Sequence, residues 1–115
     1  MVVIYEVNLE IAGDVAAEFA EWLPHHVAEV LALPGFIDAV IASDEMAGAD
    51  IKAWSVRYRL DNRQALDRYL DQHAERMRAD GMTRFGGHMR ASRRIMTEVR
   101  RLETSGPCKK TSTRD

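Results

Sequence analysis

The spacing of the hydrophobic residues changes period several times along this chain, and the order of the changes constrains the fold most strongly. Apolar residues alternate with other residues over 2–11, a period of two that is typical of a half-buried strand. The helical period then appears, and strand-like runs rich in Val, Ile and aromatic residues follow it. The predicted elements are strands over residues 2–11, 36–42, 51–60 and 90–102, a helix over residues 15–33, and a second helix between Asn62 and Gly81.

The resulting order β-α-β-β-α-β is that of the ferredoxin-like, split βαβ arrangement. Right-handed crossovers place both helices on one face of a four-stranded antiparallel sheet, with the first and third strands at its centre. The predicted class is therefore α+β. With 115 residues the chain can bury a core, and we assign residues 1–102 to a single domain. Residues 103–115 contain no apolar residue except Cys108, and we predict a disordered C-terminal tail.

Local signals refine the helix ends. Asp14 is the expected N-cap of the first helix, and Asp61 or Asn62 that of the second. Pro24 lies inside the first helical run and removes one backbone donor, so we expect a kink or a break near Leu23.

Composition excludes several classes of protein. The net charge is −2, and no basic stripe with interleaved aromatic residues is present, so no nucleic-acid partner is predicted. The longest uncharged stretch, residues 30–37, is far shorter than the roughly 20 apolar residues of a membrane span. A single cysteine and an N-terminus without signal-peptide features favour a cytoplasmic protein.

Several short stretches together resemble a small bacterial family known only as a domain of unknown function, within the dimeric α/β-barrel superfamily. They are residues 22–27, 33–36, 56–60, 84–87 and 90–94. The resemblance covers roughly residues 2–102. It implies a ferredoxin-like fold that forms a homodimer by packing two sheets face to face. The superfamily contains cofactor-free monooxygenases, haem-degrading monooxygenases and isomerases, and the fold alone does not choose among them.

Two histidines are the candidate catalytic residues. His26 and His73 each fall on the apolar stripe of a predicted helix, and both stripes face the same side of the sheet, so the two side chains are expected at one pocket. Either could act as a general base, because imidazole titrates near neutral pH. The alternative is a half-buried structural histidine that bonds to a carbonyl or a strand side chain. His25 points about 100° away from His26 and is expected in solvent.

Aromatic residues on the same side of the sheet are the candidate ligand-binding residues, namely Tyr5, Trp22, Trp54 and Tyr58. Ordinary core packing is the alternative role of Trp54. No metal site is predicted, because no pair of histidines has the spacing of convergent ligands. Asn8, Trp54 and His73 follow the element order of residues in haem-degrading relatives but not their spacing, so no cofactor is predicted.

The opposite face of the sheet carries a polar cluster, in which Glu6 and Arg57 are possible cross-strand partners. The cluster is interpreted as a dimer interface or solvated surface, with an anion site as the alternative.

Two functional hypotheses follow. The first is a small-molecule-binding or regulatory homodimer without catalysis. The second is a cofactor-free monooxygenase or isomerase that acts on an aromatic or apolar small molecule. A cavity of a few hundred Å³ with a histidine in its wall would favour an enzyme or a ligand carrier.

Overall fold

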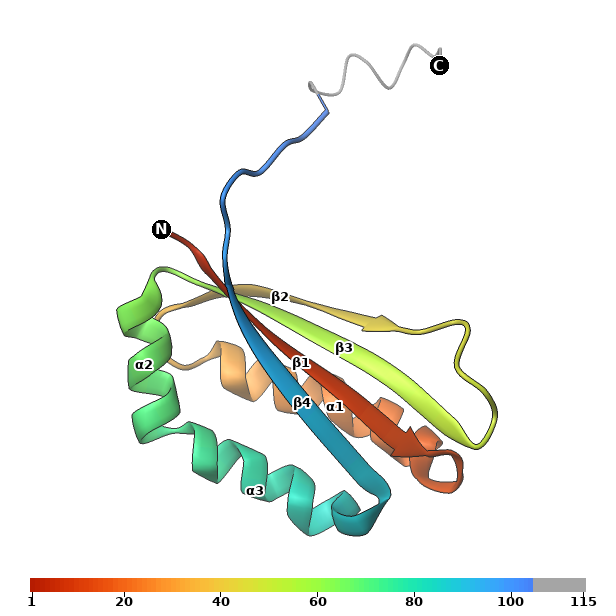
Figure 1. The fold of residues 1–115 in the computed structure, drawn as a ribbon. Coiled ribbons are helices and arrows are strands. Elements are labelled where there is room, and N and C mark those ends of the chain that lie inside the picture. Colours follow the sequence, from red (N-terminus) through yellow and green to blue (C-terminus); the bar gives the residue numbers. More distant parts are fainter. Residues whose placement is uncertain (105–115) are drawn as a thin grey trace.

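The computed structural model describes residues 1–104, which contain four strands, three α-helices and two short 3-10 helices, Gly13–Val15 and Gly86–His88 (Figure 1). The strands are β1 (Val3–Ala12), β2 (Phe36–Ser43), β3 (Ile51–Leu60) and β4 (Met89–Thr97). The helices are α1 (Ala16–Leu31), α2 (Arg63–Gln72) and α3 (Ala74–Phe85). None of the helices in this part of the chain has the length and apolar character of a transmembrane span.

The strands form one antiparallel sheet in the order β2-β3-β1-β4. The predicted α+β ferredoxin-like fold is therefore confirmed, with the first and third strands at the centre. Register places Tyr5 opposite Tyr58 of β3 and Ile95 of β4. The helices gather on one face, the covered face, and the other is the open face (Figure 1).

Strand alternation decides which residues enter the core. The odd-numbered residues of β1 point to the covered face, where Tyr5 and Ile11 are buried. Phe19 and Leu66 meet them from α1 and α2 and are fully buried. Removing such side chains from water supplies the main stabilisation of the fold.

The start and middle of α1 differ from the predictions. Asp14 is not an N-cap, because residues Gly13–Val15 form a 3-10 turn and the Gly13 amide donates to the Asp50 carbonyl at 2.7 Å. Of the kink or break expected near Leu23, the break does not occur, since α1 continues through Pro24. Pro24 is exposed, and on the solvent side water can bond the carbonyl that lacks its usual partner.

The second predicted helix is two helices, α2 and α3, joined at His73. Asn62 is the residue that caps α2, and its side chain accepts from the Ala65 amide at 2.8 Å. Successive buried positions are three residues apart from Leu66 to Tyr69 and three or four apart from Ala74 to Phe85, but Tyr69 and Ala74 are five residues apart. The stripe of buried residues is therefore interrupted at His73, where the backbone is not helical.

The ends of α3 and β4 also differ from the predicted ends. α3 continues past Gly81 to Phe85, and β4 ends at Thr97 rather than at residue 102. Residues 98–104 have no regular structure and extend past the edge of the sheet (Figure 1). The predicted disordered tail lies outside the described residues from position 105 onward.

Candidate functional site

A cavity of about 320 Å³ lies between the covered face of the sheet and helices α1 and α3. Its floor is formed by β1, β3 and β4, where Val7 lies opposite Val56 and Arg93. The volume is at the lower end of the roughly 300–1,000 Å³ of small-molecule pockets.

Two small residues, Ala91 and Gly81, shape this cavity. Ala91 of β4 lines the cavity in the row beside Leu9 and fills little of it. Gly81 of α3 also lines the cavity, and a Cβ atom there would meet the Trp22 ring at 3.3 Å and Met89 at 3.4 Å. The glycine thus lets α3 approach α1 closely beside the cavity.

His26 forms part of the wall and is mostly buried, with 14% of its side chain exposed. Its ring stacks on Trp22, with centroids 4.5 Å apart. Nδ1 lies 4.0 Å from Oδ2 of Asp80 and has no hydrogen-bond partner among the described residues. Burial lowers the pKa of His26 below its ordinary value of 6.5, although Asp80 and Glu29 oppose the shift. The imidazole is therefore neutral at pH 7 and able to accept a proton.

Three tyrosines form another part of the cavity lining. Tyr5 lies between Tyr58 and Tyr69, with ring centroids 6.1 Å and 5.9 Å away. Burial raises the pKa of Tyr69 to about 12, and burial raises that of Tyr58 as well. The hydroxyls of Tyr58 and Tyr69 therefore remain protonated at neutral pH. Tyr5 Oη accepts a hydrogen bond from Arg78 Nη2 at 3.0 Å.

The structure brings together only some of the predicted site residues. The cavity lining includes Tyr5, Trp22, His26 and Tyr58. Trp54 does not line it and packs on Phe19 instead, with ring centroids 6.0 Å apart. Its buried indole nitrogen has no partner in the described part of the chain.

His73 lies outside the cavity, so the prediction that His26 and His73 share a pocket is wrong. It sits at the junction of α2 and α3, and its Nδ1 is 3.1 Å from Arg76 Nη2. Because the buried positions change spacing at this junction, His73 does not continue the buried stripe of α2. The prediction that His25 lies in solvent is confirmed.

Sequence reasoning did not place three polar residues at this cavity: Tyr69, Arg78 and Arg93. Arg93 could have been found from strand alternation, because it shares a face of β4 with Met89 and Ala91. Arg78 directly follows the buried residue Met77. It lines the cavity because of the way α3 is rotated about its axis relative to the sheet.

Ligand atoms of His26, Glu29 and Asp80 lie within 4.8 Å of one another, as a metal site would require. However, Asp80 already accepts a hydrogen bond from Trp22 Nε1 at 3.3 Å and lies 3.5 Å from the Arg84 guanidinium. Glu29 is exposed. The arrangement serves the packing of α1 on α3. Asn8 and Trp54, the residues compared with haem-degrading relatives, lie on opposite faces of the sheet.

The open face holds a second polar cluster, centred on Glu6. Only 3% of Glu6 is exposed, although no helix covers it. Its carboxylate accepts hydrogen bonds from Asn8 at 3.0 Å, from Arg57 at 2.7 Å and from Arg94 at 2.9 Å. These bonds lower the pKa of Glu6 from 4.5 to about 2.

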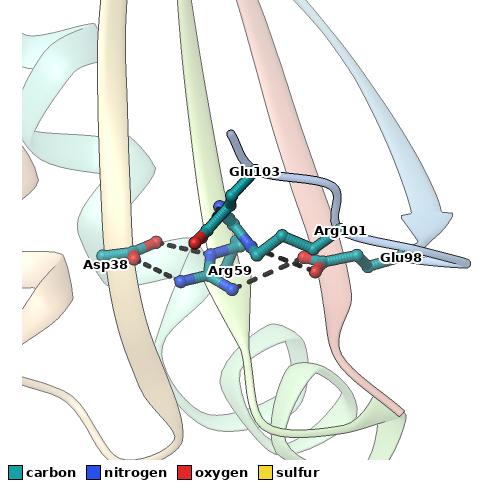
Figure 2. Close-up of polar contacts among 5 residues, drawn as sticks. All are labelled: Asp38, Arg59, Glu98, Arg101 and Glu103. Carbon is teal, nitrogen blue, oxygen red and sulfur yellow. Dashed lines mark hydrogen bonds and ion pairs between the residues drawn. The ribbon is translucent and has the colours of Figure 1, made fainter. Parts of the chain in front are cut away.

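A third cluster joins the open face to the segment after β4. Arg59 lies between Asp38 on one side and Glu98 on the other (Figure 2). Its guanidinium nitrogens are 2.5 Å from Asp38 Oδ2 and 3.5 Å from Glu98 Oε1. Arg101 contacts Glu98 at 3.3 Å. The hydrogen bonds from Arg59 lower the pKa of Asp38.

Residues 2–99 match a family model described as a domain of unknown function, DUF4286. The chain belongs to this family. No curated protein matches the DUF4286 chain.

Solved structures with the same fold are distant in sequence. SnoaB from Streptomyces nogalater, a cofactor-independent oxygenase, is 16% identical with a TM-score of 0.68, over 90% of this chain and 100% of its own. An ethyl tert-butyl ether D (EthD) family protein from Bacillus halodurans is 17% identical with a TM-score of 0.62, over 86% and 100%. A dimeric ferredoxin-like protein from an uncultured marine organism is 10% identical with a TM-score of 0.64, over 89% and 99%. At these identities the likeness shows the fold alone.

Proposed function

We propose that this DUF4286 protein binds an aromatic or otherwise apolar small molecule in the cavity between the sheet and helices α1 and α3. The observation that carries the proposal is the cavity itself, whose apolar floor is combined with a few convergent polar groups. The tyrosine hydroxyls and the His26 ring provide hydrogen-bonding groups that would orient such a ligand.

Filling the cavity tests this proposal. Ala91→Phe places a bulky side chain on the cavity floor, and Thr83→Phe, at an exposed position of α3 outside the lining, is the control. The probes are 2-naphthoate and its uncharged isostere 2-naphthamide, with binding measured by calorimetry. We expect the wild type to bind at least one probe and Ala91→Phe to weaken binding by about tenfold or more, which corresponds to about 1.4 kcal/mol. Absence of binding of both probes, or equal binding by Ala91→Phe, would contradict the proposal.

A catalytic role as a cofactor-free oxygenase or isomerase is the second candidate, and the state of His26 favours it. A neutral imidazole in a cavity wall can remove a proton from a bound carbon acid. Asp80, 4.0 Å from Nδ1, would then stabilise the imidazolium. The test follows hydrogen–deuterium exchange of 2-tetralone in D₂O by NMR. Acceleration over buffer that is lost in His26→Gln and kept in His25→Gln supports this role, and no acceleration by the wild type contradicts it.

We also propose that the protein works as a homodimer through the open faces of two sheets. The open face combines paired charges of both signs with the exposed apolar residue Val40, so a second copy could complement it. Light scattering should give twice the chain mass of 13.0 kDa. A mass of one chain at micromolar concentration would contradict the dimer.

A further inference from the structure

The charges around the cavity differ from those of the rest of the molecule. Among residues 1–104, two arginines, Arg78 and Arg93, line it, and no carboxylate does. The whole chain carries a net charge of −2, so this local excess of positive charge is not a general property of the surface. We infer that the cavity takes an organic anion, namely an aromatic acid whose carboxylate is held by Arg78 and Arg93; this rests on the proposed function.

Both arginines reach the cavity for identifiable reasons. Arg78 lies on α3, and its hydrogen bond to Tyr5 Oη holds the guanidinium beside the tyrosines. Arg93 lies opposite Val7 in register, so strand alternation directs it to the covered face. Tyr5 and Val7 are two residues apart on the same face of β1, so the residue that Arg78 bonds and the residue that Arg93 faces are neighbours along the cavity floor.

Neither arginine has an ion-pair partner among residues 1–104, in contrast to its neighbours. On the same strand, Arg94 pairs with Glu6 at 2.9 Å and Arg90 lies 4.0 Å from Glu10, both on the open face. Arg78 uses one of its donors on the hydroxyl of Tyr5, which is not a carboxylate. The cavity therefore retains guanidinium donors whose best partner is a carboxylate, because the planar fork matches its two oxygens.

The rest of the lining fits the body of such a ligand. Val7, Val56 and Leu9 form an apolar floor that extends from the tyrosine row toward Met89. From Tyr5 to Leu9 the strand advances about 13 Å. An aromatic ring on this floor would leave its carboxylate at the arginines and the tyrosine hydroxyls.

The experiment compares 2-naphthoate with 2-naphthamide, which have the same rings but differ in charge. We expect the wild type to bind the carboxylate at least about tenfold more tightly. Arg78→Gln and Arg93→Gln should each remove most of this preference, because each weakens binding of the carboxylate far more than binding of the amide. Arg90→Gln, with the same change of charge on the other face of β4, should keep the preference. Arg93 is exposed, so its variant remains informative even if loss of the Tyr5 contact unfolds Arg78→Gln.

The outcomes separate this inference from the proposed function. Equal binding of both probes by the wild type would overturn the inference and leave the proposed function intact. A preference for the carboxylate that survives both substitutions would also overturn it, because the charge would then be recognised elsewhere. If neither probe binds, the proposed function fails and the inference fails with it.

Discussion

The two faces of the sheet bury side chains in different ways. On the covered face, helices exclude water from apolar residues such as Phe19, which is fully buried. On the open face the most buried residue is a carboxylate, Glu6, which Arg57 and Arg94 cover with their own long side chains. Side chains are therefore buried by apolar packing on the covered face and by ion pairing on the open face. The two kinds of burial predict different changes in the free energy of unfolding on mutation and with pH.

The covered face itself is divided. α1 packs tightly on the sheet near Trp54, whereas the space between α3, β1 and β4 stays open as the cavity. The difference follows from side-chain size, because Ala91 lines the cavity where a larger side chain would fill it. The cavity is therefore a local exception within the covered face.

The largest expected difference between the two faces concerns Phe19 and Val40. Phe19→Ala removes a ring that contacts Trp22, Trp54 and Phe85, and it should lower the free energy of unfolding by about 3–5 kcal/mol. Val40→Ala on the open face, where the residue is 62% exposed, should change it by no more than about 0.5 kcal/mol. Urea denaturation measures both. A cost above 1 kcal/mol for Val40→Ala would show that a second copy covers this position.

Glu6→Gln tests whether the open face is stabilised by charge. Loss of the buried carboxylate should lower the free energy of unfolding by about 1–3 kcal/mol at pH 7. The pKa of Glu6 is about 2 in the folded protein and 4.5 ordinarily, so the folded state binds fewer protons. The stabilisation is therefore present above pH 5 and is lost as the pH falls toward 2.

Denaturation at pH 7, 4 and 3 should show the gap between wild type and Glu6→Gln closing with falling pH. Glu10→Gln, on an exposed residue of the same strand and face, is the control. A gap that stays constant over this range would mean that the carboxylate charge contributes nothing.

His26 and His25 allow a buried and an exposed histidine of the same helix to be compared. His26→Ala removes the stacking on Trp22 and should cost about 1 kcal/mol, whereas His25→Ala should cost less than about 0.5 kcal/mol. Because burial lowers the pKa of His26, this histidine makes the protein less stable as the pH falls below 6.5. His26→Ala should remove that part of the pH dependence. Equal thermal midpoints of the two variants at pH 7 would show that His26 is not packed in solution.

The smallest effect is expected at Arg101. It is half-exposed and contacts Glu98 at 3.3 Å in the cluster of Figure 2. Exposed ion pairs contribute little, so Arg101→Ala should change the free energy of unfolding by no more than about 0.5 kcal/mol. A larger loss, measured by urea denaturation, would indicate that the segment after β4 docks on the open face or on a second copy.

The site was only partly predictable from the sequence. The periods of strands and helices indicate which face of an element a residue occupies. This was enough to identify four lining residues, Tyr5, Trp22, His26 and Tyr58. His73 was misplaced because neither glycine nor proline marks the junction of α2 and α3. The five-residue step from Tyr69 to Ala74 is visible only in the burial of the folded chain.

Local periodicity and the handedness of crossovers are enough to predict the order of the elements, the antiparallel sheet and the separation of apolar from polar residues on β1. That Arg78 and Arg93 line one cavity, and that Glu6 is buried between two arginines, is apparent only in the folded domain. Both depend on the register between distant strands and on the phase of α3 relative to the sheet. Those relations are set by packing of the whole domain, and no local stretch of sequence specifies them.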